Sequence, residues 1–312
     1  MTQLSHTRRP QPAVPRATTL GALLERCTRR LQRARLHYGH GTERPRDDAA
    51  AILWHVLGLP PGPAPASRRV GARAVAAVDA LVSRRIAERI PVVYLTGECW
   101  FAGLPFRVDP RVLIPRSAIA ELIERRFAPW IDARRVRRIL DLGTGSGCIA
   151  CAAARAFPRA RVDASDISAG ALAVARLNIR RLRLAGRVRP VRADHYRGLR
   201  GTRYDIMVSN PPYVGRRELA GLPPEYRHEP ELALAAGPKG LDSVRVILSG
   251  AARHLRPGGL LVVEVGNTER AVRRAWPKLP FTWLDFERGG GGVFLLTREQ
   301  LAAAGRRRRR IA

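Results

Sequence analysis

The chain has 312 residues, of which 46% are apolar and 26% are charged, an ordinary balance for a globular protein of one or two domains. No stretch approaches the roughly 18 uninterrupted apolar residues of a membrane helix, and the first residues hold no apolar signal-peptide core. Four cysteines make no disulfide framework, which favours a reducing compartment. The sequence is therefore expected to belong to a cytoplasmic globular protein rather than to a secreted, membrane or fibrous one.

The charge of the chain is unusual. Lys and Arg number 56 against 26 Asp and Glu, a formal net charge of +30. All the basic residues except Lys239 and Lys278 are arginines. The excess is open to two interpretations: a surface for nucleic acid, or a preference for the GC-rich codons that Arg shares with Ala, Gly and Pro. Because the arginines occur in nearly every segment, the codon explanation is favoured for their origin. The positive electrostatic field that they create exists in either case.

The first ninety residues predict helices. Residues 1–16 are polar and rich in proline, which predicts a disordered tail. Residues 17–91 are predicted to form a small all-helical domain, because apolar residues recur there at helical spacing. Its three helices are expected at Leu20–Leu31, from a cap at Asp47 to Gly58, and at Val75–Ile86 before Pro91.

The rest of the chain predicts a doubly wound α/β fold. Residues 92–116 are expected to form a β-hairpin linker, with strands at 92–95 and 104–108. In residues 117–304, apolar strands alternate with helical stretches, which indicates βαβ units and a mostly parallel sheet. These strands are expected at 139–142, 161–165, 188–193, 204–208 and 260–265. Strands at 281–284 and 293–296, joined by a glycine loop, predict an antiparallel C-terminal hairpin, and residues 305–312 are a basic tail.

A glycine loop follows the first strand of this sheet. Asp141, Gly143, Thr144, Gly145 and Gly147 lie between the strand and a helix that begins near Cys148. The spacing is G-x-G-x-G, which differs from the dinucleotide pattern and lacks the Lys-Ser/Thr ending of a nucleotide P-loop. A carboxylate beside the loop suits an amino group better than a phosphate. A ligand with both an amine and a carboxylate, such as the methionine part of S-adenosylmethionine, therefore fits the loop better; a merely tight turn is the alternative.

Acidic residues also follow the next two strands. Asp166 is placed to accept the hydroxyl protons of a ribose, or alternatively to cap the helix that begins near Ser168. Asp194 and His195 are placed to meet an adenine ring, or alternatively form a surface loop.

The motif Asn210-Pro211-Pro212-Tyr213 follows the strand expected beside the first one, across the crevice. An amide nitrogen is a poor nucleophile, because its lone pair is delocalised into the carbonyl. The side-chain oxygen of Asn210 can accept one hydrogen of an NH₂ group, and the backbone carbonyl of Pro211 can accept the other. Holding both hydrogens favours a pyramidal nitrogen whose lone pair faces a methyl sulfonium, and Tyr213 offers a flat wall. Asn210, Pro211 and Tyr213 are thus the candidate catalytic residues, and no metal is needed; a simple Asn-Pro turn is the alternative.

At these residues the chain resembles the class I S-adenosylmethionine-dependent methyltransferases that modify planar amino groups. Val112–Arg116 and Glu225–Leu232 further resemble the glutamine methyltransferases of release factors and ribosomal proteins. Leu36–Thr42 and Pro280–Leu284 resemble the ribosomal branch, which acts on large-subunit protein L-three. The resemblance covers about residues 18–304.

This resemblance implies a seven-stranded Rossmann-like methyltransferase domain over residues 117–304 and a substrate-recognition role for the helical domain. It also implies S-adenosylmethionine as cofactor, with Asp141, Gly143, Thr144, Gly145, Asp166, Asp194, His195 and Asn210 around it. The substrate glutamine is expected to contact Arg116 and the Asn210–Tyr213 motif. His195 departs from the family pattern, which usually has a larger apolar or aromatic residue there.

Three other functions stay open. A release-factor glutamine methyltransferase is the nearest rival. A DNA adenine methyltransferase also suits Asn-Pro-Pro-Tyr, but it usually carries a DNA-recognition domain. A non-enzymatic RNA-binding protein is supported by the charge alone.

The charge near the motif predicts something about the substrate. Residues 218–242 hold Glu218, Glu225, Glu229, Glu231 and Asp242 against Arg227 and Lys239. We therefore expect an acidic lip for a basic glutamine-bearing segment. The arginines elsewhere then favour a target that is already bound to ribosomal RNA.

Cys148 and Cys151 form a single pair, for which buried helix positions are favoured over zinc or redox chemistry.

Overall fold

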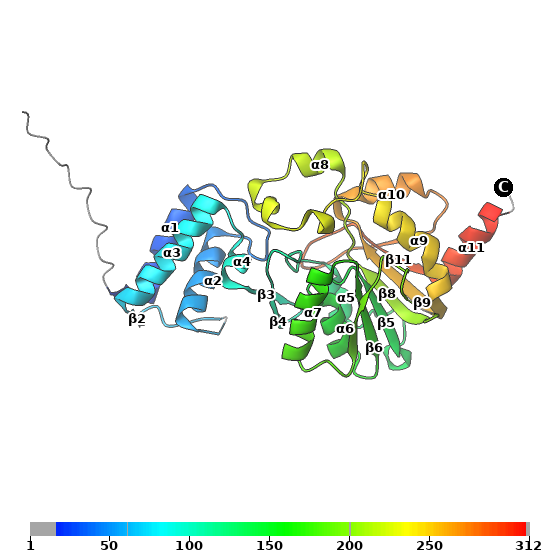
Figure 1. Ribbon diagram of the computed structural model, residues 1–312, viewed down its shortest axis with the longest axis horizontal. Helices are drawn as coiled ribbons and strands as arrows, with labels where there is room; N and C mark the ends of the chain where they lie inside the picture. Colours follow the sequence, from blue (N-terminus) through cyan, green and yellow to red (C-terminus); the bar gives the residue numbers. More distant parts are fainter. Residues whose placement is uncertain (1–16, 61, 200, 310–312) are drawn as a thin grey trace, which may run out of the picture. The chain divides into compact units, whose positions relative to one another are not determined.

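The computed structural model describes residues 17–60, 62–199 and 201–309, and the chain divides into two units (Figure 1). The first contains the described residues up to Tyr38 together with Thr42–Thr96. The second contains the short segment Gly39–Gly41 and everything from Gly97 onward. The tail expected at residues 1–16 lies outside the described residues.

The first unit is helical, as predicted. Its elements are β1 (Thr18–Thr19), α1 (Leu20–Arg33), α2 (Pro45–Leu57), β2 (Arg69–Val70), α3 (Ala72–Glu88) and α4 (Val92–Thr96). The apolar stripe of α1 is buried, which confirms the helical periodicity. Helix α2 begins at Pro45 rather than at a cap on Asp47, because proline has the φ of a first helical turn and needs no donor there. It ends at Gly58 in the left-handed conformation, as expected.

The strand expected at 92–95 is wrong, because these residues form the helix α4. The β-branched composition favours a strand, but Pro91 starts a helical turn whose carbonyl accepts N–H groups from Tyr94 (3.0 Å) and Leu95 (3.3 Å). Val92 and Val93 are buried in this conformation. The hairpin of this region therefore lies further along the chain, in β3 (Glu98–Phe101) and β4 (Leu104–Arg107).

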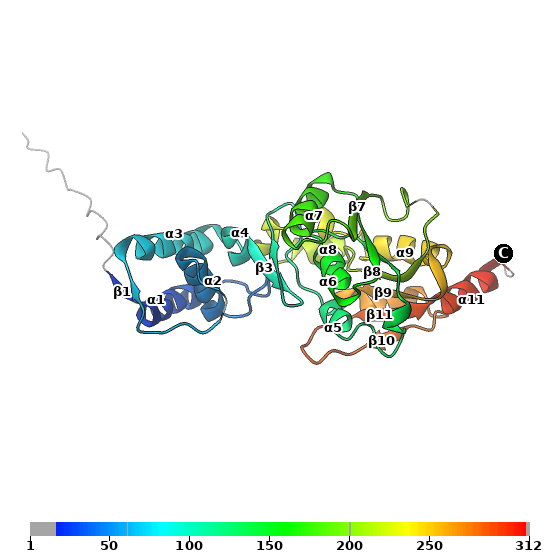
Figure 2. The same cartoon turned by 90° about the horizontal axis from the view of Figure 1, so that it is seen from below.

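The second unit is built on a seven-stranded sheet in the order β10-β11-β9-β8-β5-β6-β7. The parallel strands are β5 (Arg138–Leu142), β6 (Arg161–Asp166), β7 (Val188–Arg192), β8 (Tyr204–Ser209) and β9 (Leu255–Glu264). The antiparallel hairpin consists of β10 (Thr282–Leu284) and β11 (Val293–Thr297). Figure 2 shows β8, β9, β11 and β10 next to one another. The doubly wound fold with its antiparallel ending is thus confirmed.

Helices cover both faces of the sheet. Side chains alternate along each strand, so that Ile139 packs in one core and Leu140 in the other. The first core includes residues of α5 (Ile119–Glu124), α6 (Cys148–Ala156) and α7 (Ala169–Arg181). The second includes residues of α9 (Asp242–His254), α10 (Glu269–Ala275) and α11 (Arg298–Arg309). Such double burial accounts for the nearly continuous apolar runs of the central strands.

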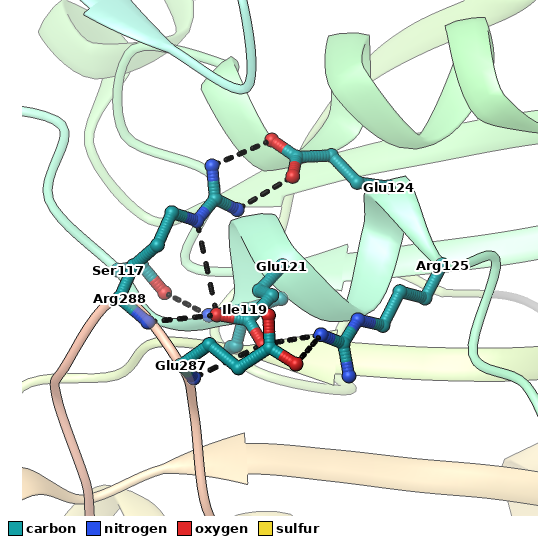
Figure 3. A network of polar contacts seen from close by, with 7 residues as sticks. All are labelled: Ser117, Ile119, Glu121, Glu124, Arg125, Glu287 and Arg288. Atoms are coloured by element: carbon teal, nitrogen blue, oxygen red, sulfur yellow. Dashed lines mark hydrogen bonds and ion pairs between the residues drawn. The ribbon is translucent and has the colours of Figure 1, made fainter.

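A polar network ties α5 to the loop between β10 and β11 (Figure 3). The carboxylate of Glu121 accepts the backbone N–H groups of Glu287 and Arg288, each at 3.3 Å. Two ion pairs join the same segments: Arg125 lies 2.7 Å from the Glu287 carboxylate, and Arg288 pairs with Glu124. These contacts fix the glycine-rich loop against the segment that precedes the sheet.

The short elements of the second unit are α8 (Arg216–Ala220) and the 3₁₀ turns η1 (Ala133–Arg135), η2 (Pro224–His228), η3 (Glu231–Ala233) and η4 (Gly266–Thr268). Within the described residues, no helix has the length and apolar character needed to span a membrane.

Candidate active site

The carboxyl ends of β5, β6 and β8 bring the three predicted motifs together. Since β5 pairs with both β6 and β8 in parallel register, the segments that follow these strands meet at one edge of the sheet. A cavity of about 310 Å³ lies at this edge. Predicted residues that line it are Gly143, Gly145, Asp166, Asp194, His195, Asn210, Pro211 and Pro212.

The glycine loop requires glycine and is fixed by protein acceptors. Gly143, Gly145 and Gly147 have φ angles of 73°, 54° and 80°, in the region that side chains rarely adopt. The Ser165 carbonyl accepts the N–H groups of Gly143 and Thr144 at 2.9 Å each. The Gly145 N–H donates to Asp166 Oδ2, also at 2.9 Å. Because these donors are used within the protein, the loop is not shaped as a phosphate cradle.

Asp141 lies beneath the loop rather than on the cavity wall. Its side chain is fully buried, and Oδ2 accepts the Thr144 hydroxyl (2.6 Å) and the Ala150 N–H (3.1 Å). Its Oδ1 has no hydrogen-bond partner among the described residues. Burial raises the pKa of Asp141 to about 7, against these two donors. Neither Asp141 nor Thr144 is among the lining residues, so the structure places both in the support of the loop, and their direct contact with a ligand stays a prediction.

Asp166 does line the cavity. Its Oδ1 accepts the N–H of Ser168 at 2.9 Å, while Ser168 itself caps α7 through the Ala171 N–H. Burial raises the pKa of Asp166 above its usual value, although the N–H groups of Ser168 and Gly145 oppose this. The helix therefore has a separate cap, which leaves the Asp166 carboxylate beside the cavity.

Asp194 and His195 lie at the same cavity. The ring nitrogen Nδ1 of His195 is 2.7 Å from Asp194 Oδ1, and the backbone of His195 has a φ of 50°. The strand before them ends at Arg192, slightly earlier than expected.

Asn210 and Pro211 stand between two cavities. Both line the large cavity, and both also line a smaller one of about 120 Å³ together with Arg116 and Tyr213. The side-chain oxygen of Asn210 is buried and has no hydrogen-bond partner among the described residues. A buried acceptor without a donor is costly, which marks this oxygen as one that a ligand satisfies.

Tyr213 forms a wall of the smaller cavity, and two glycines make room for it. A Cβ at Gly266, where φ is 45°, would lie 2.8 Å from the Tyr213 ring. A Cβ at Gly240 would lie 2.1 Å from the Tyr213 carbonyl oxygen. Burial, with a smaller contribution from Glu264, raises the pKa of Tyr213 to about 12, so the ring stays a neutral surface at physiological pH.

Arg116 lines the smaller cavity and is held by Glu229. The guanidinium donates to both carboxylate oxygens of Glu229, at 3.0 and 2.8 Å, and stacks over the Tyr226 ring at 5.6 Å. The same carboxylate accepts the Ile114 N–H at 3.1 Å and lies 3.2 Å from His40 Nε2. Burial alone would raise the pKa of Glu229, but His40 and Arg116 outweigh it and hold the pKa below its usual value.

The acidic lip expected over residues 218–242 loses two of its five acids to burial. Glu225 and Glu229 are 0% and 5% exposed. This leaves Glu218, Glu231 and Asp242 exposed against the exposed bases Arg227 and Lys239. The count of acids along the chain missed this, because it says nothing about which carboxylates the fold buries.

Two segments close the site without having been assigned to it from the sequence. Val112 and Leu113 line the large cavity, and Leu113 also lines the smaller one. The stretch 230–235 also lines the large cavity. It is held by Val214, whose N–H donates to the Leu234 carbonyl (2.8 Å) and whose carbonyl accepts the Ala236 N–H (3.0 Å). Both segments overlap motifs that carry the family resemblance, and this was the available signal for a role at the site.

Cys148 and Cys151 are buried in α6 as free thiols. In the described ranges, no group of three His, Cys, Asp or Glu side chains is arranged to hold a metal ion.

The strand order, the glycine loop and the Asn-Pro-Pro-Tyr motif at the carboxyl edge together define a class I methyltransferase. The family model of the methyltransferase small domain matches residues 125–221, and that of the PrmC N-terminal domain matches residues 22–97. A methyltransferase structure from Pyrococcus furiosus aligns with a TM-score of 0.46 and 21% identity, over 63% of this chain and 89% of that one.

Curated relatives define the family more narrowly. The ribosomal protein uL3 glutamine methyltransferase of Xylella fastidiosa is 48% identical over 83% of this chain and 84% of its own length. That of Neisseria meningitidis is 44% identical over 89% of this chain and 92% of its own. The chain belongs to the family of ribosomal protein uL3 glutamine methyltransferases.

Proposed function

We propose that this protein transfers a methyl group from S-adenosylmethionine to the side-chain amide nitrogen of a glutamine in ribosomal protein uL3. The names of its relatives supply the substrate and the reaction. The observation in the structure that carries the proposal is the buried, unpartnered Oδ1 of Asn210 at the junction of the two cavities. Because the target is a ribosomal protein, the reaction is expected in the cytoplasm.

The large cavity fits S-adenosylmethionine by its chemistry. Its wall combines the Asp166 carboxylate with apolar side chains such as Ile167, Pro212 and Ile247. A carboxylate suits hydroxyl donors, and apolar side chains suit an aromatic base. Arg111, which also lines the cavity, is paired with Asp109 at 2.6 Å, so its charge is already balanced. When bound, the cofactor supplies an electrophilic methyl group on a sulfonium.

The smaller cavity fits a carboxamide. Asn210 Oδ1 lacks a donor, and no described residue donates a hydrogen bond to the Pro211 carbonyl. Two acceptors on adjoining residues suit the two hydrogens of one NH₂ group. Held in this way, the amide nitrogen turns its lone pair away from its own carbonyl, which makes it a better nucleophile. Tyr213 limits the movement of the amide plane, and Arg116 supplies donors for carbonyl groups of the substrate segment.

Substitution of Asn210 tests the proposal. Asn210→Ala is expected to lower the turnover by about two orders of magnitude, a loss typical of an orienting group, and to leave cofactor affinity within a few-fold. The measurements are single-turnover kinetics with tritiated S-adenosylmethionine and purified uL3, and calorimetry for the cofactor. Asn210→Asp, which keeps the shape and the acceptor, serves as the matched variant and should retain more activity than Asn210→Ala.

The acceptor is tested in the same assay. Label is expected on a glutamine of uL3, located by mass spectrometry of its peptides. Purified release factor and double-stranded DNA are offered in parallel as acceptors. Label on either of them and none on uL3 would refute the substrate, and equal losses of affinity and turnover in Asn210→Ala would refute the role of the amide.

A further inference from the structure

The edge of the sheet opposite the active site is rich in arginine. All five parallel strands begin at this edge, which we call the amino edge, because their carboxyl ends form the cofactor cavity. Figure 1 shows it on the side of the sheet away from α8. At about 3.3 Å per residue, a five-residue strand separates the two edges by roughly 16 Å.

A hollow of about 430 Å³ opens at the amino edge. Its wall contains Arg138 at the start of β5, Arg161 at the start of β6, and Arg187 and Arg189 beside and within β7. Asp163 is the carboxylate of this wall, and it is already engaged. Arg189 donates to its two oxygens at 2.8 and 3.0 Å, and the Tyr204 hydroxyl donates at 2.8 Å.

The charge of the amino edge is not balanced within the protein. Asp205, next to Tyr204, is used by the backbone N–H groups of Arg137 and Arg138 and by the side chain of Arg256. In the part of the chain that the structure describes, several arginines of this edge have neither an ion pair nor a side-chain hydrogen bond: Arg138, Arg159, Arg161, Arg183 and Arg203. Four of these five are exposed, and Arg138 is half-buried in the hollow. Arg137 and Arg187 also lack an ion pair, but their guanidinium groups donate to backbone carbonyls.

We propose that the amino edge binds the phosphate backbone of RNA. Guanidinium groups bind phosphate oxygens in a bidentate manner. Arg138 and Arg161 lie opposite each other on the neighbouring strands β5 and β6, whose backbones are about 5 Å apart. A concave surface with unpaired arginines, whose carboxylates are already hydrogen-bonded within the protein, suits an anion with several phosphate groups. The proposal rests on the proposed function in one respect: a ribosomal protein as target implies RNA close to the substrate. Because the two edges lie apart, the enzyme can hold RNA at one and the glutamine segment at the other.

Removal of three unpaired arginines tests this surface. The variant Arg138→Gln/Arg161→Gln/Arg203→Gln is compared with Arg176→Gln/Arg270→Gln/Arg274→Gln, which removes the same charge from exposed positions of α7 and α10. The probe is a fluorescein-labelled single-stranded RNA of about 20 nucleotides, long enough to cover a single-strand site. Its affinity is measured by fluorescence anisotropy between about 50 and 200 mM salt.

The amino-edge variant is expected to lose tenfold or more in RNA affinity. The slope of log affinity against log salt should fall by about 2, since each lost phosphate contact contributes about 0.7. The control variant should stay within about threefold of the unchanged protein. The matching Arg→Lys triple variant should recover most of the affinity, because the charges are kept.

Equal losses in the two Gln variants would overturn the proposal, since they would show binding through net charge alone. Binding of poly-glutamate as tight as that of the RNA would also overturn it, in favour of an acidic protein partner. Methylation of free uL3 is measured for each variant and should be unchanged. Lost RNA binding with intact methylation therefore separates this surface from the proposed function of the active site.

Discussion

Glu229 allows a quantitative test of how the substrate side of the site is held. Its carboxylate receives the Ile114 N–H, two donors from Arg116 and the ring of His40, at distances between 2.8 and 3.2 Å. Glu229→Gln keeps the size of the side chain but removes its charge and one of its two acceptor oxygens. At least one of these donors then faces an NH₂ group, and the Arg116 guanidinium loses its counter-charge.

We expect Glu229→Gln to lower the free energy of unfolding by about 3 kcal/mol. Breaking one side of a buried ion pair costs about 3–5 kcal/mol, and the lower end applies because the Arg116 side chain is 27% exposed. Urea unfolding at pH 7 measures the loss. Because Arg116 lines the smaller cavity, the KM for uL3 should rise while cofactor affinity by calorimetry stays unchanged.

The pair is isolated by a double-mutant cycle and by pH. Glu229→Gln combined with Arg116→Gln should lose at least 1 kcal/mol less than the sum of the single losses, because no unpaired charge remains. The lowered pKa of Glu229 stabilises the fold above the unfolded pKa of about 4.5, and this contribution is lost as the pH falls further. The difference in the free energy of unfolding between the unchanged protein and Glu229→Gln should therefore become smaller below pH 4.5. Additive losses, or a Glu229→Gln effect under about 0.5 kcal/mol, would refute the reasoning.

Two other carboxyl groups give predictions. Asp166→Ala should weaken the binding of S-adenosylmethionine by about 2–3 kcal/mol in calorimetry, since hydrogen bonds to a charged group contribute about 1.5–3 kcal/mol each. Asp166→Asn should weaken it by less. Unchanged binding would show that Asp166 only supports the loop. Burial raises the pKa of Glu264, which is bonded to the Ser117 hydroxyl, to about 7, so the folded state disfavours its charge and stability falls as the pH rises from 4.5 to 7. Glu264→Gln should therefore match the unchanged protein near pH 4 and exceed it by up to about 3 kcal/mol at pH 8 in urea unfolding, and an equal difference at both pH values would contradict this.

The sheet was predictable from the sequence, because its signals are local. A fully buried parallel strand is an apolar run, and each run here lies between turn residues at the expected spacing. The strand wrongly expected at 92–95 shows the limit of such signals. Two valines and a tyrosine favour β structure, but the carbonyl of Pro91 and the burial of Val92 and Val93 decide for a helical turn.

The site was predictable only in part. Sequence position placed Asp166 and Asn210 at strand ends, and the structure brings both to one cavity. The partners of Glu229 are distant in sequence: Arg116 is 113 residues away and Ile114 is 115. No local pattern states that an acid will be buried by such distant donors. For the same reason, the sequence could not show whether Asp141 is buried beneath its own loop or contacts a ligand.

In the proposed mechanism, the two acceptors at Asn210 and Pro211 would also limit how far the reaction goes. An unmodified carboxamide offers two hydrogens, one for each oxygen, whereas an N-methylated one offers a single hydrogen. The product therefore leaves one acceptor of the pair unpaired, and for the buried Asn210 oxygen that costs about 1–3 kcal/mol. In the product, the methyl group faces one of the two acceptor oxygens in place of the second hydrogen. An amide held as proposed would therefore bind more tightly as substrate than as product, which would favour release after the transfer of a single methyl group.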